Sequence, residues 1–169
     1  MKLFRWFVAA ATLAAIGALL WVIFPGDERR IRRELDGLAA LFSVTEPESE
    51  LVRVARATRF GRFLTEDAVA DVGDGTTALT GRNALAALVA QTPIPPGGLR
   101  VDVVGADVTV APDRETAEVA VRVRVTSGEG DGGRPVTEDH EIACVWHNVE
   151  GRWLVARARL GGGLPSAVR

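Results

Sequence analysis

The residues best suited to chemistry lie within one short segment, residues 140–147. Side chains alternate between the two faces of a β-strand, so His140, Ile142, Cys144 and Trp146 would share one face, with His147 on the other. Histidine titrates near neutrality, and beside a carboxylate it can move a proton to and from a carbon acid. This segment therefore offers a possible general acid–base group next to apolar and aromatic side chains.

A carboxylate partner for His140 would have to come from another segment of the chain. Asp102 on a neighbouring predicted strand is the candidate, and Asp107 and Asp71 are alternatives. A histidine and an aspartate brought together in this way would be the catalytic pair of an enzyme. The competing interpretation is that His140 is a surface residue, because it lies in a stretch, residues 138–141, whose other members are all acidic.

Other reactive side chains are few. Cys144 is the only cysteine, which excludes an internal disulfide, and its apolar neighbours indicate a small core residue rather than a nucleophile. Two histidines and one cysteine without paired spacing predict no metal site and no cofactor. The glycine-rich stretches lack the Lys-Ser/Thr of nucleotide-binding loops. The formal net charge of −2 gives no reason to expect a nucleic-acid partner.

Three helices are expected to come before the strands that carry these residues. Residues 28–42 have helical period, with apolar side chains on one stripe and arginines and acids opposite. Residues 45–48 read as a capping box that opens a second helix reaching to about Arg62. Its apolar stripe would contain Leu51, Val54, Ala55 and Thr58. A third helix opens at residues 80–83 and stops before Pro93.

Long strands are expected to make up the rest of the domain. A short strand at residues 68–72 comes before the third helix, and four longer ones cover residues 99–110, 115–126, 136–149 and 152–160. The strand at residues 115–126 alternates strictly, with alanine and valine on one side and charged residues on the other. This order predicts an α+β domain in which the helices pack on one face of a curved antiparallel sheet.

Two short motifs accompany this order of elements. A Leu-Thr-Gly-Arg-x-Ala-Leu helix start occupies residues 79–85, and a Glu-Gly-x-Trp turn at residues 150–153 joins the last two strands. Over residues 28–160 the chain resembles the nuclear transport factor 2-like superfamily, in its SnoaL-like branch. The resemblance implies a cone-shaped domain at residues 26–161, in which a bent sheet wraps the helices and leaves a pocket at the open end.

The resemblance implies two functions, because the superfamily contains both enzymes and binding modules. If the face carrying His140, Ile142, Cys144 and Trp146 is concave, these residues line a ligand pocket. We expect a non-catalytic module that binds a protein partner, a second copy of itself or a small apolar ligand. The alternative is an isomerase, dehydratase or cyclase that acts on a small hydrophobic substrate through His140 and Asp102.

The N-terminal segment predicts a location. Residues 6–24 carry no charge, and as a helix they would be about 28 Å long, close to the ~30 Å hydrocarbon core of a bilayer. Trp6 and Trp21 lie near the two ends, where aromatic rings favour the headgroup level. The residues after the run offer no good cleavage site, so the sequence predicts a retained membrane anchor at residues 1–25 rather than a removed signal.

The side of the membrane follows from the flanking charges. Lys2 and Arg5 favour a cytoplasmic N-terminus, which predicts a single-pass protein of the bacterial inner membrane with a periplasmic domain and a flexible tail at residues 162–169. Four arginines just beyond the anchor argue for the opposite orientation. They would form a solvated helix face or contact lipid phosphates; they are Arg29, Arg30, Arg32 and Arg33.

Overall fold

The computed structural model describes residues 26–45, 48–72, 78–95, 97–128 and 135–161. The expected anchor at residues 1–25 and the expected tail at residues 162–169 lie outside this part of the chain. Within it, no helix combines the length and the apolar character needed to cross a membrane.

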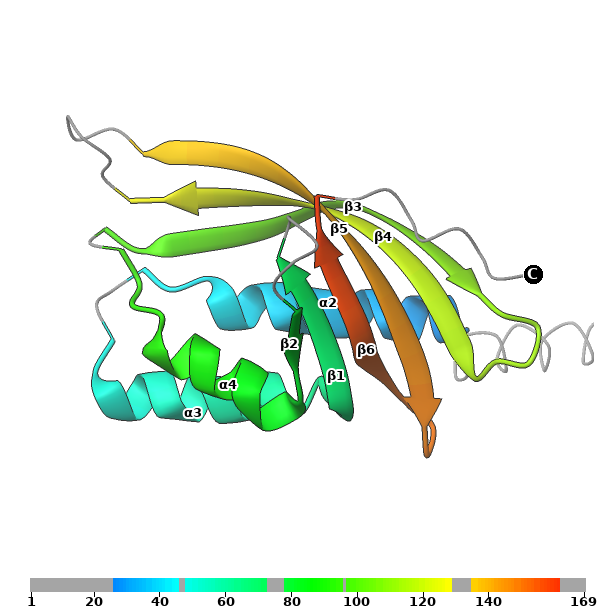
Figure 1. The fold of residues 1–169 in the computed structure, drawn as a ribbon. Coiled ribbons are helices and arrows are strands. Elements are labelled where there is room, and N and C mark those ends of the chain that lie inside the picture. Colours follow the sequence, from blue (N-terminus) through cyan, green and yellow to red (C-terminus); the bar gives the residue numbers. More distant parts are fainter. Residues whose placement is uncertain (1–25, 46–47, 73–77, 96, 129–134, 162–169) are drawn as a thin grey trace, which may run out of the picture.

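The described chain forms one curved sheet with helices against its concave side (Figure 1). The helices are α2 (Asp27–Phe42), α3 (Glu50–Gly61) and α4 (Arg82–Gln91). The strands are β1 (Leu64–Val72), β2 (Ala78–Thr80), β3 (Leu99–Val110), β4 (Thr116–Ser127), β5 (Val136–Val149) and β6 (Arg152–Leu160). The bounds predicted for the last two strands, residues 136–149 and 152–160, are those observed.

The sheet is mixed, which corrects the expected antiparallel sheet. Its six strands run in the order β2-β1-β6-β5-β4-β3, and β1 and β6 are parallel neighbours. A hairpin can join only antiparallel strands, and β1 and β6 are instead far apart in sequence. The last strand of the β3–β6 meander therefore returns to lie alongside the first strand of the domain. The short strand β2, which the sequence analysis missed, pairs with the outer edge of β1.

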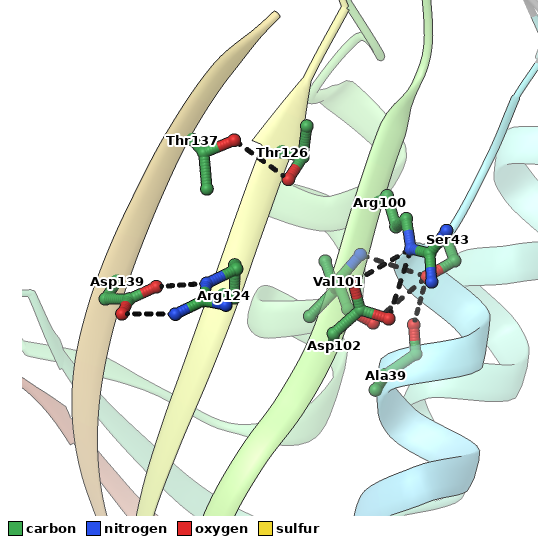
Figure 2. Close-up of polar contacts among 9 residues, drawn as sticks. All are labelled: Ala39, Ser43, Arg100, Val101, Asp102, Arg124, Thr126, Thr137 and Asp139. Carbon is green, nitrogen blue, oxygen red and sulfur yellow. Dashed lines mark hydrogen bonds and ion pairs between the residues drawn. The ribbon is translucent and has the colours of Figure 1, made fainter.

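Helix α2 lies along the concave side of the sheet because its apolar stripe faces that way. Ile31 is fully buried and Leu35 nearly so. The end of the helix is fixed to the start of β3, where the Val101 N–H donates to the Ser43 hydroxyl oxygen at 3.0 Å. Ser43 also donates to the carbonyl of Ala39, so it links the last turn of α2 to the sheet (Figure 2).

The start of α2 is fixed by a buried carboxylate. Asp27 is 8% exposed and accepts from the guanidinium of Arg114, with a shortest separation of 2.6 Å. Its other carboxylate oxygen accepts from the indole N–H of Trp153 at 3.4 Å. Arg114 stands in the β3–β4 turn and Trp153 on β6, so one side chain connects the first helix to two distant parts of the sheet. Side-chain contacts thus join both ends of α2 to the sheet or its turns.

Helix α3 differs from its prediction in both its start and its buried face. The capping box does not open it, because Ser49 is the N-cap and its hydroxyl accepts from the Val52 N–H at 3.4 Å. The buried residues are Arg56, Ala57 and Gly61, whereas Leu51 is 80% exposed. The small residues Ala57 and Gly61 let α3 approach α4 closely. Arg56 is a charged residue that is buried on this face, and its charge is paired with Glu48.

The register of β3, β4 and β5 decides which side chains face the helices. Val121 of β4 lies opposite Ile142 of β5, and Val123 lies opposite His140, so the alternation predicted for β4 continues across the sheet. In β3 the pairing shifts between Val103 and Gly105, and Val104 between them is 44% exposed. Val103, opposite Val123, thus lies on the helix-facing side of the sheet, whereas Val104 is the extra, solvent-exposed residue at this irregularity.

Candidate ligand-binding cavity

A cavity of about 300 Å³ lies between the concave side of the sheet and the helices. Helix α2 contributes the second half of its apolar stripe, α3 contributes Phe60, and α4 contributes Leu85. Strands β1, β3, β4, β5 and β6 supply the remaining walls. Phe42 and Phe60 meet edge to face with their ring centres 5.5 Å apart. A volume of this size is at the small end of the range for sites that bind small molecules.

The wall of the cavity is apolar throughout. Among the described residues that form it, only Cys144 and Trp146 carry a polar atom on the side chain. The lining residues are Leu35, Leu38, Ala39, Phe42, Phe60, Leu64, Ala68, Val69, Ala70, Leu85, Val101, Val103, Val121, Val123, Val125, Ile142, Cys144, Trp146, Val155 and Ala158. No lining side chain is a carboxylate, an imidazole or a basic group, so the wall offers no ordinary acid–base catalyst.

The four residues expected to share one face of β5 differ in their relation to this cavity. Ile142, Cys144 and Trp146 belong to the wall, as the alternation of β5 requires. His140 lies on the same face of β5 but is not part of the wall. Its Nε2 atom lies 3.3 Å from a carboxylate oxygen of Glu138, and the imidazole is 36% exposed. His140 is thus a partly exposed residue on the cavity side of β5, paired with an acid from its own strand.

Asp102 does not meet His140. It lies opposite Arg124 in the β3–β4 register, between Val101 and Val103, which both line the cavity. The pleat therefore directs Asp102 to the convex face. There it accepts from Arg100 at 2.8 Å, near the Arg124–Asp139 pair that joins β4 to β5 (Figure 2). The structure does not bring the two candidate catalytic residues together.

The other two aspartates considered for this role also lie away from the cavity wall. Asp107 lies opposite Ala120, between Ala106 and Val108, so it points to the convex face with Asp102. Asp71 of β1 is ion-paired with Arg159 of β6 at 3.1 Å. Neither residue belongs to the wall, so no described aspartate completes a pair with His140 inside the cavity.

Burial makes Cys144 a poor nucleophile. The side chain is 7% exposed, and removal from water raises the pKa of the thiol from 9.0 to about 12. The reactive form of cysteine is the thiolate, which is therefore almost absent at neutral pH. Cys144 contributes a neutral, weakly polar S–H group to the wall.

The two buried tryptophans differ in how their indole N–H groups are satisfied. Trp153 is 2% exposed, and its N–H donates to Asp27. Trp146 is fully buried, and its N–H has no acceptor among the described residues. A buried donor without a partner costs roughly 1–3 kcal/mol, so such groups are uncommon in folded proteins.

The arginines beyond the expected anchor lie on the first two turns of α2. Arg32 is ion-paired with Glu28 at 3.0 Å, and both side chains are about half exposed. The Nε of Arg33 donates to the carbonyl of Arg29 at 3.4 Å. Arg30 and Arg33 border a surface hollow that also includes Arg152 of β6. These arginines lie on a solvent-facing side of α2. Their contact with lipid phosphates stays a prediction.

No group of three or more His, Cys, Asp or Glu side chains in the described part of the chain is placed to hold a metal ion.

Most of the cavity wall was not predicted from the sequence. Leu35, Leu38 and Phe42 were recognised as an apolar stripe, but a stripe that packs into a core and one that faces a cavity have the same period. The alternating valines of β3 and β4 likewise indicate an inward face without showing whether that face packs into a core or lines a cavity.

Comparison with known proteins agrees with this geometry. A family model described as a SnoaL-like domain matches residues 53–159. This range begins within α3 and ends on β6, so it includes α4 and the sheet up to the last residue of β6. A search of curated proteins finds no match to the chain.

Several solved structures have the same fold at low sequence identity. An NTF2-like protein with a cystatin-like fold from Novosphingobium aromaticivorans is 20% identical, with a TM-score of 0.61 over 89% of this chain and 87% of that one. A candidate scytalone dehydratase from the same organism is 14% identical, with a TM-score of 0.63 over 85% and 89%. The association domain of CaMKII from C. elegans is 13% identical, with a TM-score of 0.60 over 80% and 95%.

Proposed function

Given that the chain belongs to the SnoaL-like domain family, we propose that its cavity binds a small, neutral, hydrophobic molecule without converting it. The observation that carries this proposal is the apolar wall, which surrounds about 300 Å³ and has no ionisable side chain other than the protonated thiol of Cys144. Apolar ligands gain roughly 25 cal/mol for each Å² removed from water. A charged ligand would lose its hydration without finding a counter-charge.

The size of the cavity limits the ligand. A volume near 300 Å³ suits a molecule of up to about three aromatic rings or a short branched chain rather than a sterol or a long lipid. Two aromatic rings, those of Phe42 and Phe60, stand in the wall contributed by the helices and suit a planar or cyclic guest.

Filling the cavity tests this function. We expect Val103→Phe to weaken binding of the neutral fluorescent probe N-phenyl-1-naphthylamine by at least about tenfold, because a phenyl ring would occupy space that the ligand needs. The matched control is Val104→Phe, which adds the same ring to the exposed neighbour that does not line the cavity. Probe fluorescence is titrated with the full-length chain, so any partition of the probe into lipid or detergent is common to both variants.

Equal binding by Val103→Phe, Val104→Phe and the unmodified chain would overturn the proposal. Asp102→Asn is a second control, because Asp102 lies on the convex face and is expected to leave the affinity unchanged.

An enzyme is the second candidate function, and the Glu138–His140 pair favours it. The two side chains lie 3.3 Å apart, and His140 is directly opposite Val123, which lines the cavity. A substrate extending past Val123 would reach an imidazole with a carboxylate beside it, the arrangement used for proton transfer. One structurally similar protein is described as a candidate scytalone dehydratase. Turnover of a bound ligand that is lost in His140→Ala and retained in Asp102→Asn would favour this alternative.

We also propose that residues 1–25 hold the domain at the bacterial inner membrane. The uncharged run at residues 6–24 supports this location, and α2 begins at Asp27 almost directly after it. The exposed arginines at positions 29, 32 and 33 would then lie close to lipid headgroups. Fractionation of cells that produce the full-length chain tests the proposal, and recovery in the soluble fraction would contradict it. A protein partner or a second copy on the domain surface remains a further proposal.

A further inference from the structure

A surface hollow of about 370 Å³ lies between the first half of α2 and the start of β6. Unlike the wall of the cavity, its surface is formed as much by polar atoms as by apolar ones. The residues that border it are Arg30, Arg33 and Glu34 of α2 and Gly151, Arg152 and Trp153 at the start of β6. Three guanidinium groups from two segments far apart in sequence therefore surround one open depression.

The three arginines of this hollow have no acidic partners among the described residues. Seven other arginines in the described part of the chain form ion pairs with carboxylates. Arg30 and Glu34 are four residues apart on α2 and both border the hollow, but they form no ion pair. Arg33 and Arg152 are exposed and Arg30 is half-buried, so a ligand in solvent can reach all three.

This arrangement of charges favours an anion. Three neighbouring cations repel one another, and Glu34 offsets only one of them. Arg152 donates one N–H to the carbonyl of Arg62 at 3.3 Å, which leaves further donors on the same guanidinium. A carboxylate offers two oxygens in one plane, whereas a phosphate offers oxygens in several directions. Guanidinium groups that approach from two elements therefore suit a phosphate.

The place of the hollow in the fold indicates where a phosphate would come from. Figure 1 shows the start of α2 and the turn between β5 and β6 at one end of the molecule, with the end of α2 and the start of β3 at the other. Helix α2 begins at Asp27, directly after the segment proposed to hold the domain at the membrane. Lipid headgroups would then lie near the end of the domain that carries the hollow.

We propose that this hollow binds the phosphate group of an anionic phospholipid through Arg30, Arg33 and Arg152. The inference rests on the proposed membrane location, which supplies the lipid, and it specifies the kind of lipid. A zwitterionic lipid carries an ammonium group next to its phosphate and would bring a cation toward the arginines. Arg152 separates this site from a general attraction between the membrane and α2, because it stands on β6.

Competition between two lipids tests the inference. Native mass spectrometry of the full-length chain in detergent, with equal amounts of phosphatidylglycerol and phosphatidylcholine of the same acyl chains, measures which lipid stays bound. We expect the unmodified chain to retain at least about ten times more phosphatidylglycerol, and Arg152→Gln to lower this ratio about fivefold. The triple variant Arg30→Gln/Arg33→Gln/Arg152→Gln should bring the ratio close to one.

Arg122→Gln is the matched control. It also removes one exposed positive charge, but Arg122 lies between two cavity-lining residues of β4 and so points to the convex face, where it is paired with Glu141. This substitution is expected to leave the ratio of the two lipids unchanged. An equal loss of the lipid preference in Arg122→Gln and Arg152→Gln would show that only the overall charge matters, and it would overturn the site.

An NMR measurement on the unmodified full-length chain depends on no variant and separates the two possible sources of phosphate. Glycerophosphoglycerol, the headgroup of phosphatidylglycerol without acyl chains, is expected to shift the Nε–H signals of Arg30, Arg33 and Arg152 and to leave that of Arg122 unchanged. If inorganic phosphate shifts these signals while the two lipids are retained equally, the site takes a free phosphate and the lipid inference is wrong.

The inference and the membrane location fail in different ways. Equal retention of both lipids by the unmodified chain, or a preference that persists in the triple variant, would overturn the lipid site and leave the membrane location intact. Recovery of the chain in the soluble fraction of cells, together with a lipid preference that Arg152→Gln removes, would contradict the location and leave the arginine site intact.

Discussion

Raising the pH from 9 to 11 is expected to lower the free energy of unfolding by about 2 kcal/mol through Cys144 alone. Burial raises the pKa of this thiol from 9.0 to about 12 in the folded chain. Between these values the unfolded state loses the proton and the folded state keeps it. Ionisation therefore stabilises the unfolded state, and the contribution of Cys144 to stability, complete below pH 9, falls by up to about 1.4 kcal/mol per pH unit.

The composition makes this effect easy to isolate. The sequence contains no tyrosine, and its single lysine, Lys2, lies outside the described residues. Few other groups therefore titrate in this range, because arginine remains charged beyond it. Urea unfolding at pH 8, 9, 10 and 11 measures the slope for the unmodified chain and for Cys144→Ala. The variant should be nearly flat where the unmodified chain declines, and parallel curves would show that the thiol is not protected by burial.

Arg56→Met is expected to lower the free energy of unfolding by roughly 3–5 kcal/mol. Arg56 and Glu48 are 6% and 8% exposed, and their charged groups lie 3.0 Å apart. The guanidinium also lies over the ring of Phe42, 5.8 Å from its centre, next to the cavity. Methionine fills much of the same space but leaves the Glu48 carboxylate buried without a counter-charge, and that uncompensated charge is the main cost.

The double variant Glu48→Gln/Arg56→Met separates charge from packing. Removing both charges eliminates the uncompensated carboxylate, so the double variant should recover most of the lost stability. Arg124→Met is the control for an arginine in an exposed pair, because Arg124 and Asp139 are both about half exposed, and it should shift the urea midpoint only slightly. A double variant as unstable as Arg56→Met would show that the guanidinium acts through packing rather than through charge.

Elements with strong periodicity were predictable from the sequence. The alternation of β4 identified the face that packs inward, and the bounds of β5 and β6 followed from turn residues at their ends. The same alternation predicted that Cys144 and Trp146 share one face of β5, and the structure places both in the cavity wall. Such predictions depend only on which side chains share a face, and this is a local property of the backbone.

Features that depend on long-range pairing were not predictable. Helix α3 has two stripes that could face inward, and the sequence favoured the one with Leu51 and Val54, whereas the structure buries Arg56. On the buried face Arg56 is paired with the buried carboxylate of Glu48, and the helical period of the sequence does not reveal such a pairing. The relative position of His140 and Asp102 was also not predictable from the sequence. Only the strand register shows that the two residues lie on opposite faces of the sheet.

The position of β6 has a consequence for the order in which the chain folds during synthesis. Residues 152–160 form a central strand, with β1 on one side and β5 on the other, although they come last among the strands. While the ribosome is still adding these residues, β1 and β2 have no partner in the rest of the sheet. The nascent chain therefore exposes the apolar faces of two unjoined parts of the sheet, β1–β2 and β3–β5, until β6 emerges and pairs with β1 and β5. We expect a chaperone to bind the chain during this period.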